Sequence, residues 1–104
     1  MNVILEFSVV PIGVGTSLSK YVAACERVLA ETDLHYELHA NGTNVEGEWD
    51  AVFAAVKRCH EVLHQMGVPR ISTLIKVGTR SDREQTMQGM VMSVEDKLET
   101  DGKQ

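Results

Sequence analysis

The chain has 104 residues, a formal net charge of −5, 43% hydrophobic residues and 24% charged residues. This length and composition are typical of one globular domain, so we expect residues 1–104 to fold as a single unit. A net negative charge argues against nucleic acid as a partner, because binding it requires clustered Lys and Arg. The acidic balance would suit a cationic small ligand, although most acidic excess serves solubility alone.

Membrane insertion and export are not expected from the sequence. No apolar run reaches 18 residues, and the opening MNVILEF lacks the basic region and cleavage site of a signal peptide. A cytoplasmic location is therefore expected. Cys25 and Cys59 lie in amphipathic segments without a C-x-x-C spacing, which favours reduced, buried thiols over a disulfide or a metal site.

The first half of the chain alternates between strand and helix signals. Residues 3–10 are rich in β-branched side chains and predict a strand that ends at Pro11. Thr16 or Ser17 is expected to cap a helix that runs to about residue 31. Residues 34–39 alternate as a strand, and Asn41-Gly42 is a hairpin signal because both residues tolerate positive φ.

The second half begins with a short returning strand at residues 45–48. An apolar stripe then predicts a helix over residues 49–66 that stops at Gly67, followed by a strand over residues 71–77. Ser81 and Glu84 have the spacing of a capping box and are expected to open a last helix. Its apolar stripe consists of Met87, Met90, Val91, Val94 and Leu98.

This order predicts an α+β fold. It is the ferredoxin-like βαββαβ arrangement, in which two helices cover one face of a four-stranded antiparallel sheet, with an extra C-terminal helix. Strand parity assigns a set of side chains to the other, open face. They are Ile4, Glu6, Ser8, Val10, His35, Glu37, His39, Ser72, Leu74 and Lys76.

Three interpretations of the open face remain: a solvated surface, an interface between subunits, or a pocket within such an interface. The apolar members of the face and the spare apolar helix favour the last two together.

Two histidine patterns suggest metal binding only weakly. His35, Glu37 and His39 share one strand face, and a His₂Glu set can hold zinc, but such alternation is commoner as surface charge. The H-E-V-L-H run at residues 60–64 matches a zinc protease motif, yet the chain supplies no evident third ligand. No nucleophile motif accompanies them. We therefore expect a binding protein, with no metal, no cofactor and no enzymatic activity.

The hairpin region carries a resemblance to a known family. The run Y-E-L-H-A-N-G-T-N-V-E-G-E-W, the opening E-F-S-V-V-P-I-G and the S-V-x-x-x-L ending resemble the thiamine-binding MTH1187/YkoF-like family of UPF0045-type small proteins. The signature maps onto Tyr36, Leu38, Gly42, Thr43, Val45, Glu46 and Gly47. Asn41 and Met90 depart from it, since relatives commonly carry methionine and lysine there, which could alter the choice of ligand.

The resemblance implies subunits that assemble into dimers and tetramers, with thiamine, a phosphate ester of it or its pyrimidine fragment bound near subunit contacts. A carboxylate and an aromatic face would suit the thiazolium cation, polar groups the aminopyrimidine, and basic side chains a phosphate. The expected ligand-binding residues are Ser8, Glu37, Asn41, Thr43, Glu46, Trp49, Lys76 and Arg80.

Structural roles remain open for several of these residues. Trp49 and Tyr36 would serve equally as core residues, and Lys76 and Arg80 as salt-bridge partners. The alternative function is a structural or regulatory homo-oligomer whose open face binds protein and no small ligand.

Overall fold

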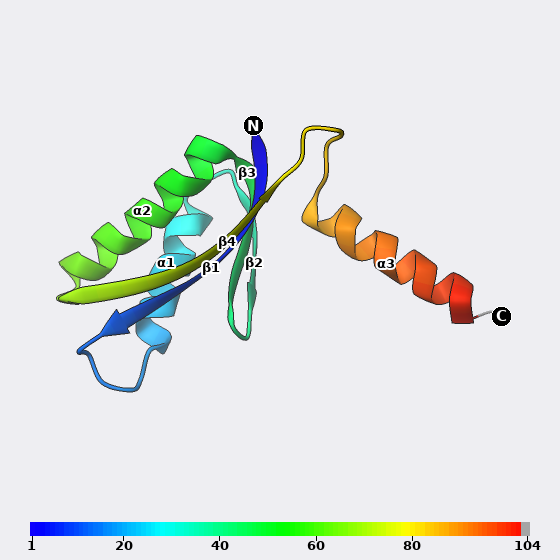
Figure 1. The fold of residues 1–104 in the computed structure, drawn as a ribbon. Helices are drawn as coiled ribbons and strands as arrows, with labels where there is room; N and C mark the ends of the chain where they lie inside the picture. The colour runs from blue at the N-terminus through cyan, green and yellow to red at the C-terminus, as the bar shows by residue number, and fades with distance from the viewer. Residues whose placement is uncertain (103–104) are drawn as a thin grey trace.

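The computed structural model describes residues 1–102, and the side chains of residues 1–100. Its elements are β1 (Asn2–Ile12), α1 (Ser19–Ala30), β2 (His35–His39), β3 (Gly42–Glu48), α2 (Trp49–Gln65), β4 (Arg70–Thr79) and α3 (Met87–Gly102). The strands form an antiparallel sheet in the order β2-β3-β1-β4, so the predicted ferredoxin-like α+β fold is confirmed. Figure 1 shows α1 and α2 on one face of the sheet, while α3 projects away on the other side.

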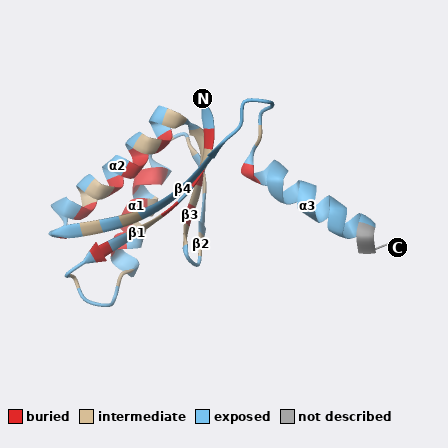
Figure 2. Ribbon diagram, viewed as in Figure 1, coloured by how far each residue is buried: buried red, intermediate tan, exposed pale blue. Residues whose placement is uncertain are grey.

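The core lies between the sheet and the helices α1 and α2. Val3, Leu5 and Phe7 alternate along β1 and are buried, as the period of two predicts. Leu29 of α1 and Leu63 of α2 close over them with no exposed surface. The buried residues in Figure 2 accordingly gather where the sheet meets these two helices.

The prediction that β1 ends at Pro11 is wrong. The strand continues to Ile12, and Pro11 pairs with Ile71 of β4. Pairing between β1 and β3 stops at Phe7, so β1 has only one neighbouring strand where Pro11 stands. A proline, which lacks an N–H donor, is tolerated at such a locally single-sided position.

The expected cap of the first helix is also wrong. The N-cap of α1 is Leu18, and no side chain accepts a hydrogen bond there. Leu18 instead packs against the core. Apolar packing therefore sets the point at which this helix begins, and the polar residues Thr16 and Ser17 remain exposed in the preceding loop.

The hairpin turn is shifted by one residue from the prediction. His39 pairs with Gly42, so Ala40 and Asn41 form the turn, and Asn41 does not have a positive φ. Gly42 belongs to β3, where a Cβ atom would lie 2.7 Å from the carbonyl oxygen of Phe7. Glycine is needed here because two backbones approach closely, rather than for a left-handed turn.

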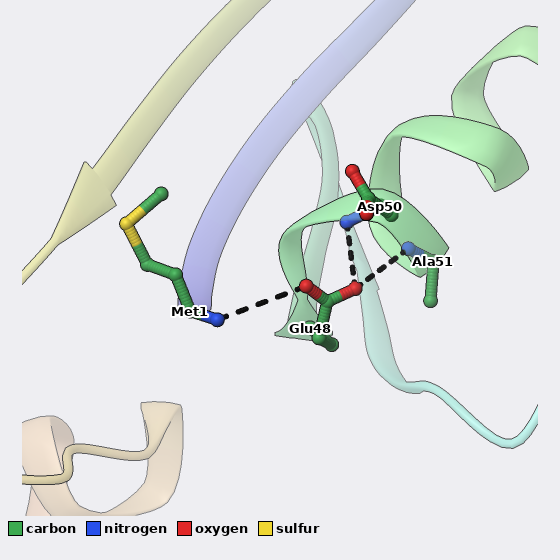
Figure 3. Close-up of polar contacts among 4 residues, drawn as sticks. All are labelled: Met1, Glu48, Asp50 and Ala51. Carbon is green, nitrogen blue, oxygen red and sulfur yellow. Dashed lines mark hydrogen bonds and ion pairs between the residues drawn. The ribbon is translucent and has the colours of Figure 1, made fainter.

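Glu48 caps α2, as Figure 3 shows. Its Oε2 accepts hydrogen bonds from the backbone N–H groups of Asp50 (2.8 Å) and Ala51 (3.3 Å), and its Oε1 lies 3.7 Å from the amino group of Met1. The helix ends at Gln65 with Met66 as its C-cap, next to Gly67 with φ +93°, so the predicted glycine stop is confirmed.

The last helix starts later than the capping box predicts. Asp82 binds Arg80, and Thr86 supplies the cap by accepting the Gly89 N–H at 2.9 Å. Met87 is the one buried side chain among those described in α3, and the helix beyond it is exposed (Figure 2). No helix in the described residues is long and apolar enough to span a membrane.

Candidate functional site

The open face of the sheet carries three rows of side chains across the strands. Because paired residues of antiparallel strands share a face, the register defines each row. The central row is Glu37, Asn44, Glu6 and Lys76; beside it lie His35, Glu46, Ile4 and Gly78 on one side, and His39, Ser8 and Leu74 on the other. The central row is polar on all four strands, which confirms the predicted assignment of this face.

His39 and Glu6 join the outer hairpin to the central strand. The Nε2 of His39 lies 3.3 Å from Glu6 Oε2 and is shielded from solvent, without forming a hydrogen bond there. The backbone N–H of Asn41 donates to His39 Nδ1 at 3.2 Å. Since Nδ1 accepts, a neutral His39 carries its proton on Nε2, where it is a donor without a partner among the described residues.

Carboxylates dominate the face. Glu6, Glu37 and Glu46 come from three different strands, and Lys76 faces Glu6 across the β1–β4 pair. Glu37 Oε1 lies 3.5 Å from His35 Nε2, and both side chains are more than half exposed. Three carboxylates against one lysine make the face electrostatically favourable for a cation.

Glu46 also tethers α3 to the sheet. Its Oε2 accepts the backbone N–H of Met87 at 2.7 Å, which satisfies one of the free donors at the start of the helix. Next to this contact is an open groove of about 1190 Å³, between the start of β1, the end of β4, residues 80–85 and Met90. Ile4 and Gly78 belong to both the groove and the open face, so the two surfaces are continuous.

The structure brings half of the predicted ligand-binding residues together. Ser8, Glu37, Glu46 and Lys76 share the open face. Asn41 is exposed in the hairpin turn at one end of that face, where its backbone orients His39.

Thr43 and Trp49 lie on the opposite side, with the helices. Thr43 is 4% exposed and its hydroxyl donates to Glu26 Oε2 of α1 at 3.1 Å. Burial raises the pKa of Glu26 against the lowering effect of this hydrogen bond, and Glu26 Oε1 is buried without a partner. Trp49 stacks on Phe53 with ring centroids 4.6 Å apart, at the edge of the core.

Arg80 lies beyond the end of β4 and is paired with Asp82. Its Nε and one terminal nitrogen donate to the two carboxylate oxygens at 2.7 and 2.5 Å. This bidentate pair lowers the pKa of Asp82 to about 2. Lys76 is therefore the basic residue of the predicted set that stands on the open face itself.

The expected ligand-binding residues did not include Glu6, His39 and Asn44 of the open face, or Glu26, which contacts Thr43 on the helix side. The first three were accessible from strand parity, since all lie on the same face as Glu37. The contact of Glu26 with Thr43 could not be predicted from the sequence. A glutamate in an amphipathic helix is ordinary, and only the fold places it against Thr43.

The H-E-V-L-H histidines make structural contacts. His60 Nε2 lies 2.6 Å from the Thr73 hydroxyl of β4, and His64 Nδ1 lies 2.8 Å from the Val68 carbonyl oxygen. Both rings thus connect α2 to the β4 side of the fold. Within the described part of the chain, no three His, Cys, Asp or Glu side chains are grouped as a metal site would require.

Comparison with known proteins identifies one family. The profile described as thiamine-binding protein matches residues 5–95. A UPF0045 protein of Synechocystis sp. is 59% identical over 99 residues, which cover 95% of this chain and 82% of that protein. The UPF0045 protein of Methanothermobacter thermautotrophicus is 38% identical over 95 residues, covering 89% and 96%.

Solved structures show the same fold. A hypothetical protein from Methanocaldococcus jannaschii superimposes with a TM-score of 0.83 at 33% identity, covering 89% of this chain and 95% of that one. A putative thiamine biosynthesis/salvage protein from Thermotoga maritima gives a TM-score of 0.78 at 20% identity, covering 90% and 99%, and this likeness bears on the fold alone.

Proposed function

The chain belongs to the thiamine-binding protein family, and from that premise we propose that it binds thiamine or its pyrimidine moiety on the open sheet face, beside a contact between subunits. The observation that carries the proposal is the polar row Glu37, Asn44, Glu6 and Lys76, which crosses all four strands. The protein acts as a binder and not as an enzyme, and it works in the cytoplasm.

The chemistry of the row matches the two halves of thiamine. The thiazolium ring is a cation, which Glu6 and Glu37 stabilise by charge. The aminopyrimidine needs paired donors and acceptors, and the Asn44 amide supplies both beside these carboxylates. Lys76, at the far end of the row, would receive the phosphate of a phosphorylated ligand.

Enclosure of the ligand requires a second surface. The face is shallow in one subunit, and Leu74 on it is 74% exposed. The groove that continues this face and the apolar side chains of α3 lie next to it. A second copy that covers α3 and the open face would remove the ligand from water, so the proposed state is a homo-oligomer, a tetramer or at least a dimer.

A thermal-shift titration with thiamine, its phosphates and its pyrimidine fragment tests the binding. A ligand at a hundred times its dissociation constant adds about 2.7 kcal/mol to the native state, a shift of several degrees for a small protein. Glu6→Gln and Glu37→Gln should weaken binding of thiamine about tenfold or more by removing charge from the contact.

Glu61→Gln is the matched control, because Glu61 is exposed on α2, away from the open face. It should bind as the parent does. Equal affinity of all three variants would refute the placement of the site, and a flat response of the parent to every ligand would refute the binding function itself.

A homo-oligomeric interaction protein without a small ligand is the second candidate. The observation in its favour is the apolar stripe of α3, where Val91, Val94 and Leu98 are 56%, 58% and 65% exposed. Val94→Asp should lower the mass measured by light scattering, while Ser93→Asp, which adds the same charge off the stripe, should leave it unchanged. An oligomer that ignores every thiamine compound would favour this candidate.

A further inference from the structure

The outer edge of β4 is unpaired along the whole strand. β1 lies on one side of β4, and no described residue pairs with the other side. Sheets usually protect such an edge with a short strand, a proline, a bulge or several charges. β4 spans Arg70–Thr79 in unbroken register with β1 and contains no proline, and Lys76 is the one charged side chain in residues 71–79. The edge is therefore open to another strand.

The pairing of β1 shows which backbone groups of β4 point outward. A Cβ atom at Gly42 of β3 would lie 2.7 Å from the Phe7 oxygen, so Phe7 directs its backbone groups to β3. Successive residues of a strand direct these groups to alternate sides, so the even-numbered residues of β1 bond to β4. Their partners, such as Lys76 opposite Glu6, are the even-numbered residues of β4. The outward N–H and C=O groups of β4 then belong to Ile71, Thr73, Ile75, Val77 and Thr79.

Apolar side chains flank this edge on both faces of the sheet. On the helix side, α2 reaches β4 where His60 Nε2 lies 2.6 Å from the Thr73 hydroxyl. Farther along, Ile75 and Val77 are 41% and 38% exposed. On the open face, Leu74 is 74% exposed. An added strand would cover these side chains while it pairs with the outward backbone groups.

We propose that the free edge of β4 pairs antiparallel with β4 of a second copy of this chain, about a two-fold axis at Ile75. In this register Ile75 faces Ile75 of the second copy, and Thr73 faces Val77, so β-branched side chains meet across the axis. Each outward residue exchanges two backbone hydrogen bonds with the residue opposite it. The two four-stranded sheets thereby become one continuous sheet.

The two neighbouring registers are less favourable. A shift by two residues in one direction sets Lys76 opposite Lys76 of the second copy, and like charges in that position are destabilising. The opposite shift sets Thr79 against Pro69, which has no N–H to donate. In the proposed register Lys76 instead faces Leu74, and its aliphatic stem can pack on that side chain.

Charge at the ends of the pairing is compensated. Arg70 of one copy would face Arg80 of the other, and Asp82 already binds Arg80 through both carboxylate oxygens. The edge is thus complementary to itself from end to end, which favours a second copy over a strand of a different protein.

The pairing would extend the open face across two copies. Leu74 and Lys76 of the second copy would stand beside Lys76 at the end of the polar row, and this consequence alone rests on the proposed ligand site. The start of α3 is fastened to Glu46 of β3, two strands away from the free edge. Contacts through α3 and through β4 can therefore form together, and two different two-fold contacts would give the proposed tetramer.

Amide hydrogen exchange, followed by NMR on the unmodified protein, tests the pairing. The outward amides of Thr73, Ile75 and Val77 should be as protected as those of Leu74 and Lys76, which bond to β1. Without the pairing the two sets would alternate, with the outward amides exchanging about tenfold faster or more. That alternation would overturn the proposal, whether or not the protein binds a ligand.

Ile75→Lys tests the position of the axis, because it places two like charges opposite each other there. It should weaken the association about tenfold or more and lower the mass measured by light scattering. Ser72→Lys is the matched control, since it adds the same charge on the same strand opposite Gly78 of the second copy. Circular dichroism checks that both variants fold. Equal masses of the parent and Ile75→Lys would contradict the proposal.

Cross-linking tests the register. Ile75→Cys should be joined between copies by a short bismaleimide, whereas Ser72→Cys should not, because two copies of residue 72 would lie about 20 Å apart. The native Cys25 and Cys59 are buried. A link at residue 72 in place of residue 75 would contradict the register. A monomeric parent at micromolar concentration would overturn the pairing and leave the edge to a strand of a different protein.

Discussion

Glu46 Oε2 and the backbone N–H of Met87 are 2.7 Å apart, and this hydrogen bond fastens the start of α3 to strand β3. The two residues are 41 positions apart in sequence. Met87 is buried at this point, whereas the next turns of the helix extend into solvent (Figure 1). One carboxylate of the open face therefore sets where the C-terminal helix leaves the sheet.

Glu46→Ala should loosen this attachment. The Met87 N–H loses a charged acceptor, a hydrogen bond worth about 1.5–3 kcal/mol, so its amide exchange should accelerate about tenfold or more. Native-state hydrogen exchange measures the effect. Glu46→Gln is the control, because its amide oxygen still accepts and should preserve much of the protection. Equal exchange in all three proteins would show that packing of Met87 alone holds the helix.

Glu48→Ala should destabilise the protein by about 1 kcal/mol, because two N–H groups of α2 lose their shared acceptor. For a chain of this size the melting temperature should fall by about 4–8 °C. Glu48→Asp offers a shorter side chain that is common at N-caps and should retain most of the stability. A melting temperature unaffected by the alanine variant would mean that water replaces the cap without loss.

Gly42→Ala should cost about 1–3 kcal/mol, since the added Cβ would stand 2.7 Å from the Phe7 carbonyl oxygen, and backbone must shift to admit it. Gly78→Ala is the matched control in another strand of the same sheet. There the nearest atom, the Ile4 oxygen, is 4.0 Å away, so the change should stay within about 0.5 kcal/mol. Urea denaturation compares the two variants, and equal stabilities would contradict the close-approach argument.

Glu26→Gln should stabilise the protein at neutral pH. Burial raises the pKa of Glu26 above its ordinary value of 4.5, so the folded state holds this proton more tightly than the unfolded chain. Stability from this group is thus lost as pH rises through the window between 4.5 and the raised pKa, and it is restored on acidification. Glutamine has no charge to desolvate.

Thermal denaturation of both proteins across this pH range checks the sign. The advantage of the glutamine variant should be largest at neutral pH and should vanish below about pH 4, where both side chains are neutral. A variant that is less stable at neutral pH would show that the hydrogen bond from Thr43 to the charged carboxylate outweighs the cost of burying the charge.

Strand parity was the most informative signal in the sequence. The alternation in residues 3–10 and 71–77 assigned Glu6, Ser8 and Lys76 to one face, and the register agrees. The same rule places Thr43 with Val45 on the helix side. Thr43 was expected in the site on family resemblance, which identifies a residue as characteristic without indicating which way its side chain points.

Other features depend on contacts that local patterns do not contain. Leu18 is the N-cap of α1 because its side chain packs against the core. A rule based on polar capping residues does not take such packing into account. Glu26 meets Thr43 across 17 positions, a pairing created by the packing of a helix on a strand. For α3 the sequence predicted an apolar stripe correctly. The stripe indicates that these side chains favour burial, but the sequence does not indicate which surface they pack against.

The projection of α3 makes the molecule long, with extents of 55 × 30 × 20 Å and a radius of gyration of 16.1 Å. A compact chain of this length has a radius of about 13 Å. A second copy of the chain that covers the exposed stripe, as proposed above, would bind the folded chain alone, and by mass action it would stabilise that chain in proportion to the logarithm of the protein concentration. The melting temperature of such an oligomer would rise with protein concentration, and dilution alone would destabilise the protein.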